Sequence, residues 1–332
     1  MSQYIVAVVG ATGVVGQELI QTLEQRNFPV KTLIPLASAR SAGTTITFNG
    51  QEIEVKELTE TSFEGVDYGL FSAGGSISEK FAPIAAKAGC IVIDNTSFFR
   101  MHKDVPLVVP EVNPEALKNH QNIIANPNCS TAQMVMPLKP IHDKATIKRI
   151  VVSTYQSVSG AGKDAIDELA GHTNKSLQGA NPEPEQFVKQ IAFNVIPQID
   201  DFTDNGYTKE EMKMINETQK ILGADIKVTA TTVRVPVFIG HSESINIQTK
   251  DPIDVDEVRR LLADFPGVEV MDNPAEGIYP TPRETAGQDP VFVGRIRKDI
   301  SQPNTIEMWV VADNLRKGAA LNAIQIAEAL IK

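Results

Sequence analysis

The stretch Tyr4-Ile-Val-Ala-Val-Val-Gly10-Ala-Thr-Gly13-Val-Val-Gly16 decides the fold of the first half of the chain. It begins with a short β-branched apolar run, which is typical of a buried parallel strand. The three glycines form a GxxGxxG turn, and residues 14–23 then carry apolar side chains at helical spacing. A strand, a glycine turn and a helix in this order are typical of a site that holds a pyrophosphate at the helix N-terminus. A tight turn without a ligand is the alternative interpretation.

The alternation of strands and helices continues to about residue 125. A helix is expected at 78–88, with Ser78 as its N-cap. Strands that alternate with helices in this way predict a parallel, doubly wound, Rossmann-like sheet of the α/β class. The further strands of this sheet are expected at 31–37, 66–71, 90–94, 105–109 and 123–125.

The pattern changes after residue 130, where strands become more polar and helices longer, as at 209–222. This predicts an α+β second domain with a mostly antiparallel sheet. The polar segment 172–190 is expected to be a long surface loop or an interface segment. The last helix, 317–331, follows the N-cap pair Asp313-Asn314 and can return to the first domain. The strands of the second domain are expected at 151–155, 228–237, 244–249, 291–296 and 305–311.

Composition excludes several classes of function. The net charge of −10 over 332 residues argues against nucleic acid as a main partner, because phosphate binding needs a basic surface. Two cysteines cannot form a disulfide framework, and five scattered histidines give no metal-ligand cluster. No targeting segment or membrane-spanning apolar run is visible, so a cytoplasmic protein is expected.

The residues after the second strand bear on the choice of cofactor. An acidic residue often follows this strand in sites that bind the ribose 2′-hydroxyl of NAD. Here the sequence reads Ser38-Ala-Arg40-Ser41, and a forked arginine between hydroxyls suits a 2′-phosphate. The sequence therefore predicts NADP, and an exposed surface arginine without a ligand is the alternative.

One of the two cysteines is a candidate nucleophile. Cys129 follows Asn126-Pro-Asn128 directly and, with Ser130, comes just before a helical pattern that starts at Thr131. Backbone N–H groups and the dipole at a helix N-terminus favour a thiolate and can hold a developing oxyanion. The alternative is a small buried side chain that only fills space.

Three further polar residues lie within apolar segments. Gln156 closes a strand before a glycine-rich loop, where it can bind a carbonyl or simply cap the loop. Arg234 lies inside a strand, so it needs an anionic partner, which is either a ligand carboxylate or an internal Asp or Glu. His241 follows seven positions later and is either the acid/base partner of the cysteine or a structural histidine.

These motifs together resemble the aspartate-β-semialdehyde dehydrogenase family. The resemblance extends from residue 5 to about 330, and the segment Tyr207–Lys213 is similar to the bacterial form. The motifs that carry it are Gly10-Ala-Thr-Gly-Val-Val-Gly16, Ser38-Ala-Arg-Ser41, Asn126-Pro-Asn-Cys129-Ser-Thr131, Gln156-Ser-Val-Ser-Gly-Ala-Gly162 and Arg234-Val-Pro-Val-Phe-Ile-Gly-His241-Ser-Glu-Ser244.

The resemblance implies a role for each matching residue. Cys129 is the acyl-thioester nucleophile, His241 the acid/base group, and Gln156 positions the substrate or its adduct. Arg234 binds the substrate carboxylate and Glu210 its amino group, with Glu210 preferred to Glu211 by its spacing to Lys213. Arg100 and Lys213 hold inorganic phosphate or the acyl phosphate. The residues implied to bind NADP are Gly10, Thr12, Gly13, Val14, Val15, Ser38, Arg40, Ser41, Ser159, Gly160 and Asn314.

The implied reaction is the NADPH-dependent reductive dephosphorylation of L-4-aspartyl phosphate to L-aspartate 4-semialdehyde, and its reverse. It serves the synthesis of lysine (through diaminopimelate), methionine and threonine. The family forms homodimers or homotetramers through the second domain. Residues 1–128 with 314–332 are therefore assigned to the NADP-binding domain, and 129–313 to catalysis and dimerisation.

Two rival functions are left open. N-acetyl-γ-glutamyl-phosphate reductase shares the fold and the chemistry, but that family has Tyr after its cysteine, where this chain has Ser130. A noncatalytic NADP-binding paralogue should have lost the cysteine or the histidine, and this chain has both.

Overall fold

A computed structural model describes residues 3–331, and the chain divides into two compact units. Unit 1 comprises the chain up to Asn128 together with the segment from Ala319 onward, and unit 2 is Cys129–Gly318. The return to unit 1 lies at Ala319, five residues after the position 314 that the sequence predicted. Among the described residues, no helix is both long and apolar enough to span a lipid bilayer.

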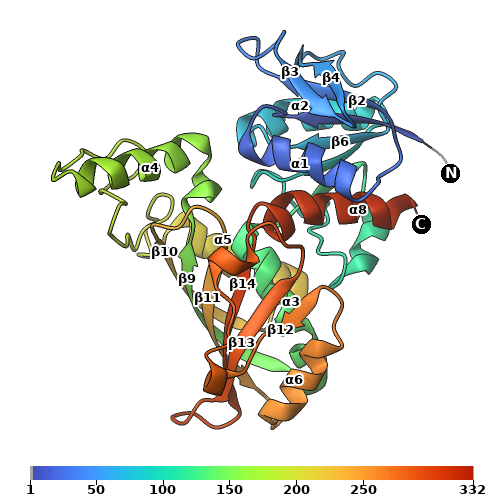
Figure 1. Cartoon of the computed structure of the whole chain (residues 1–332). Helices are drawn as coiled ribbons and strands as arrows, with labels where there is room; N and C mark the ends of the chain where they lie inside the picture. The colour runs from blue at the N-terminus through green and yellow to red at the C-terminus, as the bar shows by residue number, and fades with distance from the viewer. Residues whose placement is uncertain (1–2, 332) are drawn as a thin grey trace. The chain divides into compact units, whose positions relative to one another are not determined.

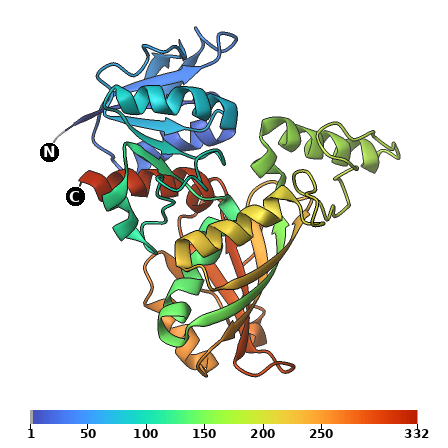
Figure 2. The same cartoon turned by 180° about the vertical axis from the view of Figure 1, so that it is seen from behind.

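Unit 1 is built on a parallel sheet with the strand order β5-β2-β1-β6-β7-β8 (Figure 1). Helices α1 (Val14–Gln25) and α2 (Gly75–Lys87) cover opposite faces of this sheet, as Figures 1 and 2 show from the two sides. This confirms the predicted doubly wound α/β fold. The strands are β1 (Tyr4–Val9), β2 (Val30–Ala37), β5 (Lys56–Glu57), β6 (Tyr68–Phe71), β7 (Ile91–Asp94) and β8 (Ile123–Ala125), and a separate hairpin pairs β3 (Thr45–Phe48) with β4 (Gln51–Glu54).

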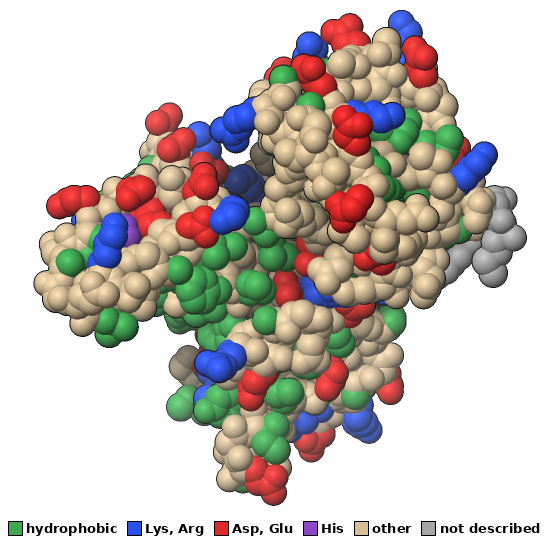
Figure 3. Space-filling view, turned by 45° about the horizontal axis from the view of Figure 1, so that its top comes forward, with side chains coloured by type: hydrophobic (Ala, Val, Ile, Leu, Met, Phe, Trp, Pro, Cys, Tyr) green, Lys and Arg blue, Asp and Glu red, His purple; other side chains and the backbone are tan. Residues whose placement is uncertain are grey.

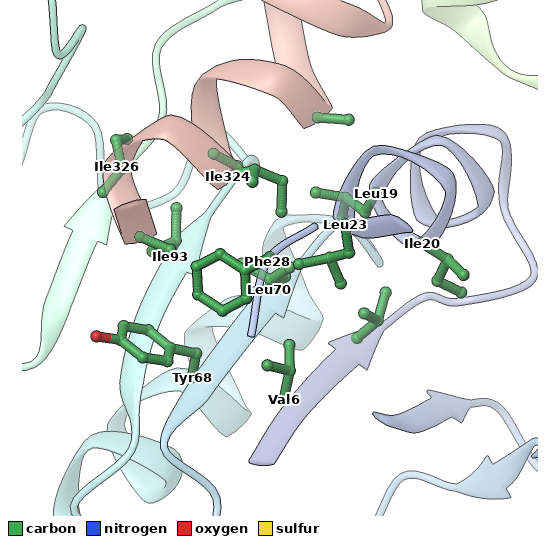
Figure 4. Close-up of a cluster of buried hydrophobic side chains, with 14 of the residues drawn as sticks. Val6, Leu19, Ile20, Leu23, Phe28, Tyr68, Leu70, Ile93, Ile324 and Ile326 are labelled. Carbon is green, nitrogen blue, oxygen red and sulfur yellow. The ribbon is translucent and has the colours of Figure 1, made fainter. Parts of the chain in front are cut away.

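The C-terminal helix α8 (Leu321–Ile331) belongs to unit 1 because its apolar face completes the core there. Figure 4 shows Ile324 near Leu23 of α1 and Ile326 near Ile93 of β7. These four side chains are almost fully buried, and burial of each contributes on the order of 1.5–3 kcal/mol.

The glycine turn lets α1 start directly against β1. Gly10 has a φ of 86°, a conformation that favours glycine. A Cβ on Gly16 would lie only 2.1 Å from the carbonyl oxygen of Gly10, so the first turn of α1 packs on the backbone of the glycine turn. Only a residue without a side chain permits this approach.

Unit 2 is built on a mixed sheet with the strand order β10-β9-β11-β14-β13-β12. β9 pairs antiparallel with β11, β11 with β14 and β14 with β13, while the two outer pairs are parallel. Helices α3 (Cys129–Ala145), α5 (Lys209–Leu222) and α6 (Val255–Ala263) lie on one face of this sheet (Figure 2). The strands are β9 (Ile147–Gln156), β10 (Lys227–Arg234), β11 (His241–Thr249), β12 (Val268–Val270), β13 (Val291–Lys298) and β14 (Thr305–Ala312).

Short helices and one longer arm complete the two units. Helix α4 (Lys163–Leu177) forms the arm of unit 2 that Figure 1 labels. The 3₁₀ helices are Pro114–Asn119, Val158–Ala161 and Pro274–Glu276, the short helix α7 is Pro282–Thr285, and a π-helical turn spans Arg316–Ala320.

Two predictions about unit 1 are wrong. Ser78 does not cap α2, because the helix begins three residues earlier, after Gly74 with a φ of 99°. The Ser78 hydroxyl instead donates to Asp94 Oδ1 at 2.8 Å. Residues 105–109 do not form a regular strand, since Leu107 makes only an isolated bridge to Ala125.

Two predictions about later segments also need correction. The first part of the segment 172–190, which was expected to lack helix, is helical. Helix α4 continues to Leu177 and buries His172. The last helix does not start at 317 as a regular α-helix but as the π-helical turn Arg316–Ala320. Asp313 caps this turn, since its Oδ1 accepts from the Leu315 N–H at 2.8 Å, whereas the Asn314 side chain binds elsewhere.

Candidate active site

Cys129 is the first residue of α3 and is partly accessible. Cys90, by contrast, is fully buried among apolar groups, and burial raises the pKa of its thiol to about 12. Neither cysteine forms a disulfide. Of the two thiols, only that of Cys129 has the exposure and the helix-start position of a nucleophile.

The segment before Cys129 is fixed within unit 1 by buried amides. Asn126 Oδ1 accepts from Asn322 Nδ2 at 2.6 Å, and Asn126 Nδ2 donates to Asn95 Oδ1 at 2.8 Å. Arg100 Nε donates to the Asn126 carbonyl at 2.9 Å, and Arg100 Nη2 donates to the Asn95 carbonyl at 2.7 Å. Arg100, expected to hold phosphate, thus also braces the backbone that leads to the nucleophile. Sequence reasoning did not find Asn322.

A glycine of the π-helical turn lies against the nucleophile. A Cβ on Gly318 would be 2.7 Å from Cys129 Cβ and 3.0 Å from Cys129 Cα. Contacts this short are essentially never seen for real side chains. The close approach of the two backbones therefore depends on Gly318, which the sequence analysis did not single out.

His241 is the first residue of β11 and is completely buried. Its Nδ1 accepts from the Ser157 backbone N–H at 3.0 Å and lies 3.1 Å from the Ser157 hydroxyl. Among residues 3–331, Nε2 has no hydrogen-bond partner. Burial, assisted by Arg234, lowers the pKa of His241 to about 3, while Glu210 and the Gly240 backbone act in the opposite direction.

Arg234 closes β10 beside His241. A Cβ on Gly160 would lie 3.4 Å from both Arg234 Nη1 and His241 Nε2, so the two side chains face the same glycine. Arg234 Nη1 donates to the Ser157 carbonyl at 2.6 Å. Burial lowers the pKa of Arg234, opposed by Glu210 and Cys129. None of the ion pairs among the described residues includes Arg234, so no internal salt bridge occupies it.

Gln156 links β9 to helix α5. Its Nε2 donates to Glu210 Oε1 at 3.1 Å, and its Oε1 accepts from the Thr154 hydroxyl at 3.0 Å. Lys213 Nζ lies 3.1 Å from Glu210 Oε2 and 2.9 Å from Asp200 Oδ2. The structure thus brings Gln156, Glu210 and Lys213 into one chain of contacts. Asp200 was not predicted, since it lies in a loop without a motif.

Glu210 and Glu211 have different surroundings. Glu211 completes a capping box at the start of α5: its Oε2 accepts from the Thr208 N–H at 2.7 Å, and its Oε1 from the Thr232 N–H at 2.9 Å. Glu211 is therefore occupied by backbone groups, and Glu210 is the one directed toward Gln156.

Asn314 and Ser159, predicted to bind the cofactor, bind each other. Asn314 Oδ1 accepts from the Ser157 hydroxyl at 3.0 Å and from the Gly240 N–H at 2.9 Å, and Asn314 Nδ2 donates to Ser159 Oγ at 3.0 Å. This network ties Gly240, the residue before His241, to the loop that contains Ser157 and Ser159. It was not visible in the sequence, because the three segments that contribute to it are far apart in the chain.

A cavity of about 430 Å³ opens at the glycine turn of unit 1. That volume suits a small-molecule site. Six predicted cofactor residues line it, whereas Val14 and Val15, the first two residues of α1, do not. Glu57, which the sequence analysis missed, contributes a carboxylate to the same cavity. The predicted residues that line it are Gly10, Thr12, Gly13, Ser38, Arg40 and Ser41.

Comparison with known proteins identifies the family. The family model described as semialdehyde dehydrogenase, NAD binding domain, matches residues 5–120, and that of the dimerisation domain matches 138–317. An aspartate-semialdehyde dehydrogenase from Shewanella sp. (strain DB6705) is 58% identical, with 100% of this chain and 99% of that protein covered. This chain belongs to the aspartate-semialdehyde dehydrogenase family.

Solved structures of the aspartate-semialdehyde dehydrogenase family agree. The enzyme II from Vibrio cholerae, complexed with ASA, is 55% identical with a TM-score of 0.97 over 100% of this chain and 99% of that one. An aspartate-semialdehyde dehydrogenase from Candida albicans with NADP is 29% identical, with a TM-score of 0.78 and 99% of each chain covered.

These matches confirm the predicted family, fold class and enzyme class. The chain is an enzyme of the aspartate-semialdehyde dehydrogenase family, in aspartate-pathway amino-acid biosynthesis, with an NAD(P)-binding domain and a dimerisation domain.

Proposed function

We propose that the chain converts L-4-aspartyl phosphate to L-aspartate 4-semialdehyde, and the reverse, through a thioester on Cys129. The observation that carries this proposal is the position of Cys129 at the first residue of α3, within electrostatic range of the buried Arg234. The backbone N–H groups and the dipole at a helix start favour a thiolate and stabilise the oxyanion that forms when it attacks a carbonyl.

The charged groups near Cys129 match the two ends of an aspartyl substrate. Arg234, buried and without a carboxylate partner among the described residues, binds the substrate α-carboxylate as a fork. Glu210 takes the amino group, which is supported by the engagement of Glu211 in the capping box. Gln156 orients the reacting carbonyl, and Lys213 and Arg100 bind the phosphate.

In the biosynthetic direction the Cys129 thiolate attacks the acyl carbon, the bond to phosphate breaks, and phosphate leaves with the electron pair. Reduction of the thioester then gives a thiohemiacetal oxyanion, which expels the Cys129 thiolate and releases the aldehyde. Covalent capture in this way splits a difficult reduction into easier steps.

NADP is the proposed cofactor, and its nicotinamide supplies or accepts the hydride. The cavity at the glycine turn fits a dinucleotide, because α1 starts directly against Gly10 and the cavity includes Arg40 and Ser41 for a 2′-phosphate. The relative from Candida albicans was solved with NADP. Ser159, Gly160 and Asn314 are proposed to border the nicotinamide end.

The remaining proposals concern the setting of the enzyme. Residues 1–128 with the C-terminal segment form the cofactor domain, and the rest forms the catalytic and dimerisation domain. We propose that the enzyme acts in the cytoplasm as a homodimer or homotetramer, on the route to lysine, methionine and threonine.

The test is phosphate-dependent NADP reduction by aspartate semialdehyde, measured for wild type, Cys129→Ser and Cys90→Ala. Cys129→Ser should lose at least about 10³-fold in kcat, because a serine hydroxyl stays protonated at neutral pH. Cys90→Ala removes the other thiol and should retain activity near that of wild type. N-acetylglutamate semialdehyde serves as the competing substrate.

Substantial activity in Cys129→Ser would exclude the thioester route. A preference of the wild type for N-acetylglutamate semialdehyde would replace the aspartyl substrate with that of the rival reductase.

A further inference from the structure

One aromatic side chain outside the predicted site lies against Arg234. The guanidinium carbon Cζ of Arg234 lies over the Phe187 ring, 6.0 Å from its centre. A cation within about 6 Å of the centre of an aromatic ring is attracted by the negative ring face, and the attraction grows when the pair is removed from water. Arg234 is only 6% exposed, so Phe187 is one of the groups that hold the buried guanidinium in place.

A contact with a ring face leaves the hydrogen-bonding groups of the arginine available. An aromatic ring attracts a cation but accepts none of its in-plane N–H bonds, whereas an Asp or Glu at this place would pair with the guanidinium. The Ser157 carbonyl accepts from Arg234 Nη1 at 2.6 Å. Phe187 therefore stabilises the cation without competing for the fork that is proposed to bind the substrate carboxylate.

Phe187 belongs to the irregular segment 178–190 after helix α4, which we call the α4 loop; it is part of the arm in Figure 1. A buried carboxylate of α4 holds the backbone of this loop. The Glu168 side chain is 2% exposed, and it accepts from the Glu185 N–H at 3.3 Å and from the Gln186 N–H. These two residues directly precede Phe187, so one carboxylate sets the direction in which the chain presents the ring.

Apolar packing and a second polar contact hold the rest of the α4 loop. Gln190 closes the loop, since its Nε2 donates to Ser176 Oγ and to the Ala192 carbonyl, each at 3.2 Å. Phe187 itself packs against a buried apolar cluster that includes the residue after Ser157, so the cluster joins the loop to the segment whose carbonyl binds Arg234. The members of this cluster are Val158, Ala165, Leu169, Ile191, Ala192 and Ile196.

We propose that Phe187 is a positioning residue for Arg234, and that Glu168 holds the α4 loop so that the Phe187 ring forms one wall of the subsite for the substrate carboxylate. The inference rests on the proposed function, in which Arg234 binds that carboxylate. The ring fixes the guanidinium and excludes water from it, and a carboxylate binds an arginine more strongly in less polar surroundings. The alternative is that Phe187 only fills the core of the arm.

The first test compares Phe187→Leu with Phe187→Tyr in phosphate-dependent NADP reduction. Leu is apolar but has no ring face, whereas Tyr retains the ring. We expect Phe187→Leu to raise the KM for aspartate semialdehyde about 3- to 10-fold, as for loss of a cation–π contact, while kcat and the KM for NADP stay close to those of wild type. Phe187→Tyr should have a semialdehyde KM near that of wild type.

The matched control is Phe265→Leu. Phe265 is also half-buried and lies between α6 and β12, the strand at the opposite edge of the sheet from β10, where Arg234 lies. It should leave both KM values unchanged, at a protein concentration where light scattering gives all variants the same oligomeric state. An unchanged semialdehyde KM in Phe187→Leu, an equal rise in its KM for NADP, or an equal rise in Phe187→Tyr would overturn the proposal.

The second test concerns Glu168 and does not depend on activity. Glu168→Gln keeps the size of the side chain but replaces one accepting oxygen with a donor, so one of the two N–H groups before Phe187 loses its partner. Hydrogen exchange followed by mass spectrometry should show faster exchange in the peptide 183–190 than in wild type. Glu183→Gln, at an exposed position of the same loop, should exchange as wild type. Unchanged exchange in Glu168→Gln would overturn the role of Glu168.

The two tests together separate the inference from the proposed function. Glu168→Gln should also raise the semialdehyde KM, and faster exchange without that rise would show that the loop does not position the ring. If N-acetylglutamate semialdehyde is the better substrate, the same comparison is made with it, because it also has a free α-carboxylate. A wild type that oxidises neither semialdehyde would refute the proposed function, while hydrogen exchange would still decide whether Glu168 holds the α4 loop.

Discussion

Among single residues, Glu243 is a carboxyl group whose protonation depends on burial. It lies on β11 two positions after His241, is fully buried, and burial raises its pKa well above the ordinary value of 4.5. Its neighbour Gln133, four residues after Cys129 on α3, donates to the His241 carbonyl at 3.3 Å. A carboxyl group whose pKa is raised by burial thus lies between the nucleophile's helix α3 and the histidine's strand β11.

This burial predicts how stability depends on pH. Above pH 4.5 the unfolded chain releases the proton of Glu243 while the folded protein retains it, so the free energy of unfolding falls as pH rises. The contribution is at most about 1.4 kcal/mol per pH unit. Glu243→Gln should remove it and raise stability at pH 7–8, as measured by urea unfolding between pH 5 and 8. The exposed Glu276→Gln is the control, and identical slopes for wild type and Glu243→Gln would show that Glu243 is ionised.

Arg40 is the residue on which the preference for NADP depends. It lines the cavity of the glycine turn with Ser38 and Ser41, and Glu57 lines the same cavity. Loss of a charge-assisted contact costs on the order of 1.5–3 kcal/mol, so Arg40→Glu should lower the NADP to NAD ratio of kcat/KM by about 10- to 100-fold. Glu57→Gln removes a negative charge and should shift the ratio slightly toward NADP. An unchanged ratio in Arg40→Glu would move the 2′-phosphate contact to other residues.

Among the elements, the π-helical turn Arg316–Ala320 has a direct effect on the nucleophile. Such turns are rare and are often found at functional sites. Because a Cβ on Gly318 would lie 2.7 Å from Cys129 Cβ, Gly318→Ala must displace the start of α3 or the turn itself. A displacement of about 1 Å costs on the order of 10²-fold in rate, and we expect that loss in kcat/KM.

The matched control for this substitution is Gly171→Ala in α4, where an added Cβ meets no atom within 4 Å. It should leave the kinetics unchanged. The rate of Cys129 alkylation by iodoacetamide reports the position of the thiol without turnover, and it should change in Gly318→Ala alone. If Gly318→Ala had the same alkylation rate and the same kcat/KM as wild type, the turn would have relaxed without moving Cys129.

The elements also show what local sequence can predict. The glycine turn, the start of α3 at Cys129 and the bounds of α5 follow from patterns a few residues long. The end of α4 was missed because its polar sequence suggests an exposed loop. In the structure, Glu168 of α4 is buried and lies beside His172. Its carboxylate accepts from the Glu185 and Gln186 N–H groups, so a polar side chain of the helix holds the loop that follows it.

Local sequence patterns could not predict the contacts that shape the site, because these contacts join distant parts of the chain. Ser157 with His241 and Gly318 with Cys129 join residues that are close only after the sheet of unit 2 has formed. The motifs indicated which residue types belong to the site. The hydrogen-bond partners that set their protonation and position depend on tertiary packing.

For the whole molecule, the question is what covers the large hydrophobic side chains that unit 2 exposes. Figure 3 shows hydrophobic side chains gathered beside the α4 arm. Five of the exposed large hydrophobic residues come from the segment 177–202, within the match to the dimerisation domain. They are Leu177, Val188, Phe193, Val195 and Phe202. A second copy of the chain covering this surface would remove it from water, and exposed apolar patches of this kind mark interaction sites.

Phe193 is the best position to test this arrangement. Its side chain is 67% exposed and its φ is 59°, a conformation that Asp adopts more readily than Phe, so Phe193→Asp should not harm the fold. A large apolar side chain at an interface contributes about 2 kcal/mol, so the substitution should weaken dimerisation about 30-fold. Light scattering over a dilution series measures this, with Ile300→Asp, at a still more exposed position outside the segment, as control. If Phe193→Asp and Ile300→Asp both dissociate at the same protein concentration as wild type, neither substitution weakens the dimer. The dimer then uses another surface, and the apolar segment 177–202 must have a different partner.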